Sequence, residues 1–279
     1  MTQHPNRPTY AHKAAGTLPL LLALLVLAGA CVPLPAESPR DSGENATPRK
    51  PPCAEISFPP DRLACLKKEF SRADGELNAV YKKLRASLSE PVRGDLKDNS
   101  LGWIRMKEYN CEFQSEMMQN ATTDARQAAF YRCALDYTTD RIQYLRRAFG
   151  REGVKPGLPG EYDDGFSGSL AFEPGDKQDS YKFRIEVVRG PTAHIGEIDG
   201  EVFLQNGATG VFKERPNCPD SETAARQRFD GGRRAEPCCR LDFRLKNHKG
   251  FRTIAVKETN CGYYHGARAY FDGLYRKIK

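Results

Sequence analysis

Apolar residues recur every three to four positions in the part of the chain that follows residue 52. The repeat predicts one long helix whose apolar face carries Leu63, Leu66, Phe70, Ala73, Leu77, Val80, Leu84 and Leu88. Pro59-Pro60-Asp61 provides a start signal for this helix, and Pro91 is expected to end it.

Two further helices are predicted by the same spacing. The second is marked by Leu96, Trp103, Met106, Cys111, Phe113 and Met117, and the third, after a polar turn at 119–124, by Phe130, Cys133, Tyr137, Leu145 and Phe149. The connections are short, so residues 53–149 are expected to form a three-helix antiparallel domain with Trp103 in its core.

The pattern changes to strict alternation after residue 160. Strands are predicted at 166–172, 181–187, 201–204, 210–212, 239–245, 253–257 and 269–278, with Gly, Pro, Asn and Asp in the turns. Residues 161–279 are therefore expected to form an antiparallel β-sandwich or small barrel. Glycines in the first and last of these strands would suit a sheet whose ends meet. The predicted class is α+β with two domains, joined by a Gly- and Pro-rich linker at 150–160.

The N-terminus has the features of a lipoprotein signal segment at residues 1–31. Arg7 and Lys13 precede an apolar run at 18–27, which is too short to span a bilayer, and small residues lead to Cys31. We expect cleavage before Cys31 and lipid attachment to its thiol. Residues 32–52 are polar and Pro-rich, as in a disordered tether. In a Gram-negative host, Val32 in place of Asp favours the outer membrane, so the expected location is the cell envelope, lipid-anchored and facing the periplasm.

The charge distribution argues against nucleic acid as a partner. The formal net charge is +7, and removal of the signal segment with its two cations lowers it to near +5. No run of five like charges occurs, so the surface is expected to be mildly basic and well solvated.

The cysteines indicate disulfides rather than metal. Besides Cys31 there are eight, four in each half: Cys53, Cys65, Cys111, Cys133, Cys218, Cys238, Cys239 and Cys261. A zinc site is not expected because the chain has no CxxC and no histidine at ligand spacing. Cys111 and Cys133 are equidistant from position 122 on a helical hairpin, so they can pair and leave Cys53 with Cys65. The alternative, in which Cys111 and Cys133 both cross to the first helix, stays open.

No motif of an enzyme is present, and neither a cofactor nor a metal is expected. The sequence contains no GxSxG, Walker loop or HExxH. A candidate binding loop instead combines Tyr263, Tyr264 and His265 with Arg268, next to Cys261. Tyrosines on a pinned turn provide large contact area at low entropic cost.

The helical half resembles the LprI-type lysozyme-inhibitor family. The resemblance rests on Cys65, Asp74, Leu77, Asn78, Tyr81, Leu84, Trp103, Cys111, Cys133, Arg141 and Leu145. Two positions differ: Ser100 stands where the family usually has Gln, and Lys107 where it usually has Arg, which loses bidentate geometry. Asp74, Asn78 and Tyr81 share one helix face and are interpreted as packing residues, with an exposed recognition ridge as the alternative.

The β half resembles a small periplasmic β-domain, through Gly196-Glu197 and the stretches 239–243, 261–266 and 271–275. This resemblance suggests a Cys239–Cys261 bridge, which leaves Cys218 with Cys238.

The LprI resemblance implies an inhibitor that occludes the substrate cleft of lysozyme, its expected partner. The alternative is a non-enzymatic envelope adaptor that binds peptidoglycan or another partner.

Overall fold

A computed structural model describes residues 52–216, 218, 238–248 and 250–279. The expected signal segment, Cys31 and all but the last residue of the expected tether lie outside the described residues.

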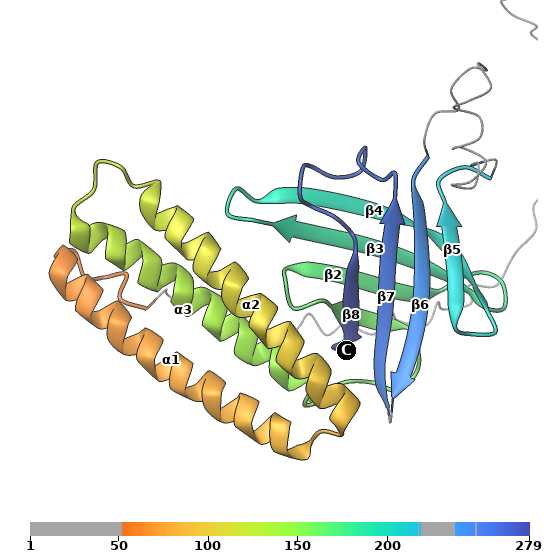
Figure 1. The fold of residues 1–279 in the computed structure, drawn as a ribbon, viewed down its shortest axis with the longest axis horizontal. Coiled ribbons are helices and arrows are strands. Elements are labelled where there is room, and N and C mark those ends of the chain that lie inside the picture. Colours follow the sequence, from red (N-terminus) through yellow and green to blue (C-terminus); the bar gives the residue numbers. More distant parts are fainter. Residues whose placement is uncertain (1–51, 217, 219–237, 249) are drawn as a thin grey trace, which may run out of the picture. The chain divides into compact units, whose positions relative to one another are not determined.

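The helical half consists of α1 (Pro59–Ser87), α2 (Glu90–Glu116) and α3 (Thr123–Ala148). α3 packs against both other helices (Figure 1). The prediction for Pro91 was wrong: α1 ends at Ser87, and Pro91 lies in the first turn of α2. A proline is tolerated there because the first amides of a helix have no intrahelical acceptor. Thr122 caps α3 by accepting a hydrogen bond from the amide of Ala125 at 3.2 Å.

The core of the helical half is built from the predicted apolar faces. Trp103 is only 4% exposed, and it packs with Leu77, Leu84, Leu96, Ile142, Leu145 and Phe149. Two disulfides join Cys53 to Cys65 and Cys111 to Cys133, which is one of the two pairings that the sequence left open.

The second half is a closed antiparallel barrel in which each strand pairs with the next and β1 pairs with β8. Its strands are β1 (Gly160–Asp163), β2 (Gly168–Pro174), β3 (Ser180–Arg189), β4 (His194–Gln205), β5 (Thr209–Lys213), β6 (Arg240–His248), β7 (Phe251–Thr259) and β8 (Gly273–Lys277). The structure confirms the barrel alternative of the prediction, but its first and last strands differ from the predicted ones. β1 lies before the first predicted strand, and β8 begins four residues after the predicted start at 269.

Alternation along the strands directs one set of side chains into the barrel. In β3, the inward positions are Phe183, Ile185 and Val187, and the intervening residues are exposed. The ring of Phe183 lies 4.9 Å from that of Phe243, centroid to centroid. Two further disulfides join Cys218 to Cys238 and Cys239 to Cys261.

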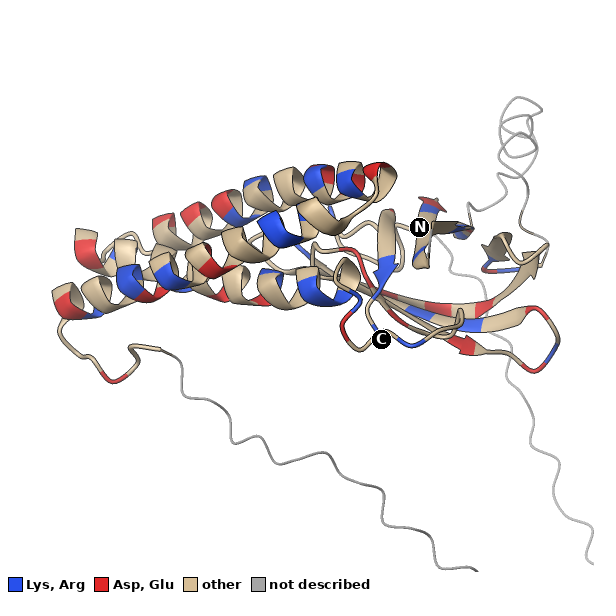
Figure 2. Ribbon diagram, turned by 90° about the horizontal axis from the view of Figure 1, so that it is seen from below, with Lys and Arg blue, Asp and Glu red and all other residues tan. Residues whose placement is uncertain are grey.

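Helices and barrel share packed and polar contacts. Asn99 of α2 donates to the backbone oxygen of Asp164 at 2.9 Å. The buried guanidinium of Arg276 in β8 pairs with Asp95 of α2 at 2.9 Å and lies over the ring of Phe149. Lysine and arginine alternate with acidic residues along both halves (Figure 2), in agreement with the mixed surface expected from the sequence.

Candidate functional site

The predicted binding residues lie in the segment between β7 and β8, residues 260–272, which we call the β7–β8 loop. The loop begins at the Cys239–Cys261 disulfide. Glu258 at the end of β7 holds it at two points: one carboxylate oxygen lies 3.0 Å from Nε2 of His265, and the other accepts from the amide of Phe271 at 2.7 Å. The loop is therefore a pinned element with a defined conformation.

The loop lies against β4 near the β3–β4 turn. The amide of Gly266 donates to the oxygen of Ile195 at 3.0 Å, and the amide of Glu197 donates to the oxygen of Tyr264 at 3.1 Å. Gly196 lies directly beside His265, and a Cβ at position 196 would come within 2.6 Å of the His265 Cβ. The close approach of the loop thus requires glycine in β4.

The four predicted residues do not share one environment. Tyr263 is 94% exposed, and Arg268 is also exposed, with a φ of 72° that turns the backbone sharply. Tyr264 packs against the barrel core. Tyr263 and Arg268 are therefore the two members that a partner could reach most directly.

His265 of the candidate binding loop faces inward. Its side chain is only 5% exposed. Nδ1 lies 2.9 Å from the oxygen of Gly266, and Nε2 faces Glu258. The rings of Tyr270 and Phe271 contact it edge-on at 5.3 Å. The imidazole thus positions the loop, because each of its nitrogens lies within hydrogen-bonding distance of a protein oxygen.

Further exposed apolar side chains accompany the loop. Ile195 is 66% exposed and Tyr270 is 55% exposed, and Val188 is paired in register with Ile195. We call Val188, Ile195, Tyr263, Arg268 and Tyr270 the loop surface. Sequence reasoning missed three of these residues, Val188, Ile195 and Tyr270. The available signal was that Val188 and Ile195 are apolar at positions where the alternation predicts outward-facing residues.

Several of the residues that carry the LprI resemblance gather around Trp103. Arg141 of α3 lies over the indole at 5.3 Å and donates to Ser100 at 3.1 Å, and burial lowers the pKa of Arg141 to about 10. Lys107 lies over the same indole at 5.1 Å. On α1, Asn78 donates to Asp74 at 2.9 Å. The ring contacts favour a packing role for Arg141 and Lys107, whereas Asn78 is exposed and bonds within its own helix.

A groove of about 350 Å³ lies over this cluster. Its walls come from α1 and α2, and Arg141 and Leu145 contribute to it from α3. Leu101 and Ile104 of α2 line it with partly exposed side chains. The groove offers an apolar surface, but it contains no exposed aromatic anchor comparable to Tyr263.

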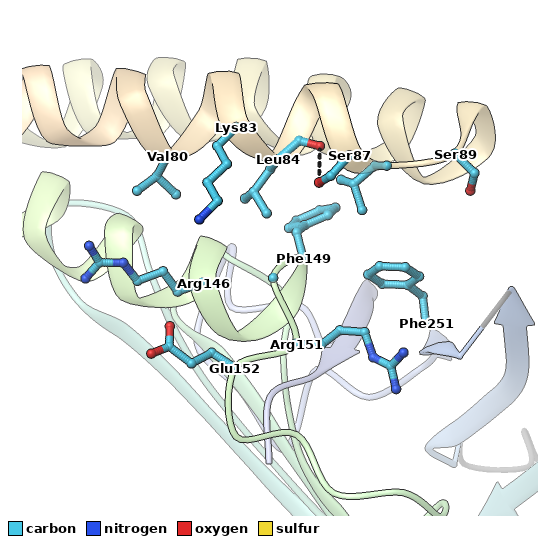
Figure 3. A pocket seen from close by; sticks show the side chains of 12 residues that line it. Val80, Lys83, Leu84, Ser87, Ser89, Arg146, Phe149, Arg151, Glu152 and Phe251 are labelled. Carbon is cyan, nitrogen blue, oxygen red and sulfur yellow. Dashed lines mark hydrogen bonds between the residues drawn. The ribbon is translucent and has the colours of Figure 1, made fainter.

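A second cavity, of about 930 Å³, is lined by α1, the residues around the end of α3 and the first residue of β7 (Figure 3). Three of its lining residues are cations, Lys83, Arg146 and Arg151. We call this cavity the basic cleft. Nothing in the sequence patterns singled it out, because its cations come from segments that are 63 to 68 residues apart.

Among the described residues, no helix has the length and apolar character needed to cross a bilayer. Comparison with curated proteins and with solved structures gave no match. The family model described as Lysozyme inhibitor LprI matches residues 53–145. The match covers α1, α2 and most of α3 and confirms the resemblance drawn from the cysteines and Trp103. The helical half of this chain is therefore similar to the LprI lysozyme inhibitors.

Proposed function

We propose that this protein is a non-enzymatic lysozyme inhibitor, fixed to the outer membrane by lipid on Cys31. The observation that carries the inhibitory function is the match of residues 53–145 to the LprI family model. The lipid anchor is supported by the basic residues Arg7 and Lys13, the short apolar run at 18–27 and the small residues before Cys31.

We assign occlusion of the lysozyme cleft to the loop surface. A glycosidase cleft contains a general acid and a second carboxylate that must both reach the sugar. Tyr263 extends from the pinned loop and provides an aromatic anchor for such a cleft. Arg268 is exposed on the same loop and can pair with a carboxylate through two parallel hydrogen bonds. His265 keeps the loop in place and does not itself contact the enzyme.

Long-range electrostatic attraction contributes little to this complex. Many lysozymes are strongly basic, and the mature chain has a net charge near +5. Steering of like-charged partners is unfavourable, so affinity has to come from buried contacts. The exposed side chains of Ile195, Tyr263 and Tyr270 provide apolar area for such contacts.

The test is an assay of cell-wall lysis by lysozyme with the purified mature protein added. We expect inhibition at a near-stoichiometric ratio. Tyr263→Ser should raise the inhibition constant about 30-fold, since buried aromatic anchors cost 2 kcal/mol or more when truncated. Tyr109→Ser, at an exposed tyrosine of α2, is the matched control and should change nothing.

Two results would contradict the proposal at different levels. Undiminished lysis at a tenfold excess of the protein would refute the inhibitory function and favour the envelope-adaptor alternative. Full inhibition by Tyr263→Ser, combined with loss of inhibition in Ile104→Ser, would leave the function standing but transfer the contact from the loop surface to the helical groove.

A further inference from the structure

We propose that the basic cleft binds the carboxylate-bearing stem peptide of cell-wall fragments. The inference rests on the proposed function, because it places the inhibitor on the polymer that lysozyme attacks. The cleft belongs to α1, the segment around the end of α3 and the start of β7, and the loop surface does not contribute to it.

The rim of the cleft has cationic groups that the protein itself does not neutralise. Lys83 is exposed and forms no ion pair with any described carboxylate. Arg151 is exposed too, and its guanidinium lies 5.7 Å from the ring centre of Phe251. Only Arg146 has an acidic partner, Glu76 at 2.8 Å. Glu152 is the single carboxylate among the lining residues, so the rim favours an anionic ligand.

The lining of the cleft also contains apolar residues. They are Val80, Leu84, Leu88, Phe149 and Phe251. Figure 3 shows Lys83 extending from α1 toward Arg146 of α3, and Phe251 lying near Arg151 on the other side of Phe149. A ligand that fits this cleft therefore combines apolar groups with carboxylates.

Two hydroxyls complete the lining. Ser87 donates to the oxygen of Leu84 at 3.1 Å, which leaves its own oxygen as an acceptor. Ser89 precedes α2 but makes no side-chain cap, so its hydroxyl can bond to a ligand. Amide groups are suitable partners, since they both donate and accept.

A cell-wall stem peptide combines these three features. It carries alanine methyl groups, backbone amides, and acidic side chains with a terminal carboxylate. A neutral glycan lacks groups for Lys83 and Arg151. A cleft of about 930 Å³ is within the range of sites for ligands of this size.

Binding in the cleft leaves the loop surface free. Phe251 is the first residue of β7 and the β7–β8 loop follows its last residue, so the nine-residue strand separates the two sites by about 27 Å. A protein held on the wall through the cleft would meet lysozyme at a raised local concentration.

The experiment is calorimetric titration of the mature protein with a purified disaccharide–tetrapeptide from peptidoglycan. We expect Lys83→Gln and Arg151→Asn each to weaken binding about fivefold, as for one charge-assisted contact at a partly exposed site. Lys82→Gln, one residue away on α1 and outside the cleft, should bind like the unaltered protein. Lys83→Arg, which keeps the charge, should retain most of the affinity.

Three results would overturn the inference: no heat of binding at millimolar fragment, equal binding of the neutral tetramer of N-acetylglucosamine, or equal weakening by Lys82→Gln. The two proposals are separable. Tyr263→Ser should lose lysozyme inhibition but still bind the fragment. Lys83→Gln should inhibit lysozyme normally on a soluble neutral oligosaccharide. Fragment binding without any lysozyme inhibition would support the cleft and refute only the inhibitory function.

Discussion

Asp163 gives the sharpest prediction for stability. It is the last residue of β1, and its Oδ1 accepts a hydrogen bond from the amide of Gly165 at 2.6 Å. Burial raises the pKa of its carboxyl from 3.8 to about 6, with a further upward contribution from Asp164. The Gly165 amide and the guanidinium groups of Arg141 and Arg189 act in the opposite direction and are too weak to compensate.

A raised carboxyl pKa means that the folded protein binds this proton more tightly than the unfolded chain. The stabilisation is fully present below the unfolded value near 4, and it is lost as the pH rises through about 6. One pKa unit corresponds to about 1.4 kcal/mol, so the whole shift is worth up to about 3 kcal/mol. Asp163 is not fully enclosed, and we therefore expect about 1 to 3 kcal/mol.

Asp163→Asn removes the ionisation and keeps an acceptor for Gly165. Urea unfolding should show the variant about 1 to 3 kcal/mol more stable than the unaltered protein at pH 7.5 and nearly equal at pH 4. The control is Asp176→Asn, at a side chain that is 85% exposed and pairs only with Lys182, where we expect no effect. An equal gain at both pH values, or a loss at pH 7.5, would show that burial of the Asp163 charge is not the cause.

Three further predictions concern the loop, the linker and the anchor. Glu258→Ala leaves the amide of Phe271 without an acceptor, at a local cost of about 1 to 3 kcal/mol. Hydrogen exchange of the backbone amides at 261–271 should therefore accelerate. Unchanged exchange would show that Glu258 does not hold the β7–β8 loop in place. Cleavage after Arg151 should yield two fragments on a denaturing gel without reductant, because each disulfide lies within one half; a single band would contradict this. Cys31→Ser should release the exported protein from membranes, and an unmodified Cys31 in the membrane-bound form by mass spectrometry would refute lipid attachment.

The period of the apolar residues was sufficient to predict both halves of the fold. Leu66, Leu77 and Leu84 repeat with the helical period and are buried in α1. Phe183 and Ile185 repeat with period two and point into the barrel. Short strands were harder, since β1 has only four residues and a single buried side chain. It pairs along its whole length with β2, and its second edge pairs with β8, more than 100 residues away.

The candidate site was only partly predictable. Aromatic content and a nearby cysteine identified the β7–β8 loop, and Tyr263 is indeed exposed. The inward turn of His265 depends on Glu258 and on Gly196 of a different strand, and no local pattern encodes that meeting. The basic cleft could not be predicted from the sequence either, because Lys83, Arg151 and Phe251 become neighbours only in the folded chain.

The pairing of β1 with β8 has a consequence for the order of folding. During synthesis, residues 160–163 emerge more than 100 residues before their second partner, and one edge of β1 stays open until residues 273–277 are available. An open edge can pair with another chain, so we expect a risk of aggregation during this interval. The helices are complete by then, and Asp95 and Phe149 already present the contacts that receive Arg276. We therefore expect the contacts of Arg276 with the helices to favour insertion of the last strand, and loss of the final seven residues, 273–279, to leave the edge of β1 unpaired and the protein prone to self-association.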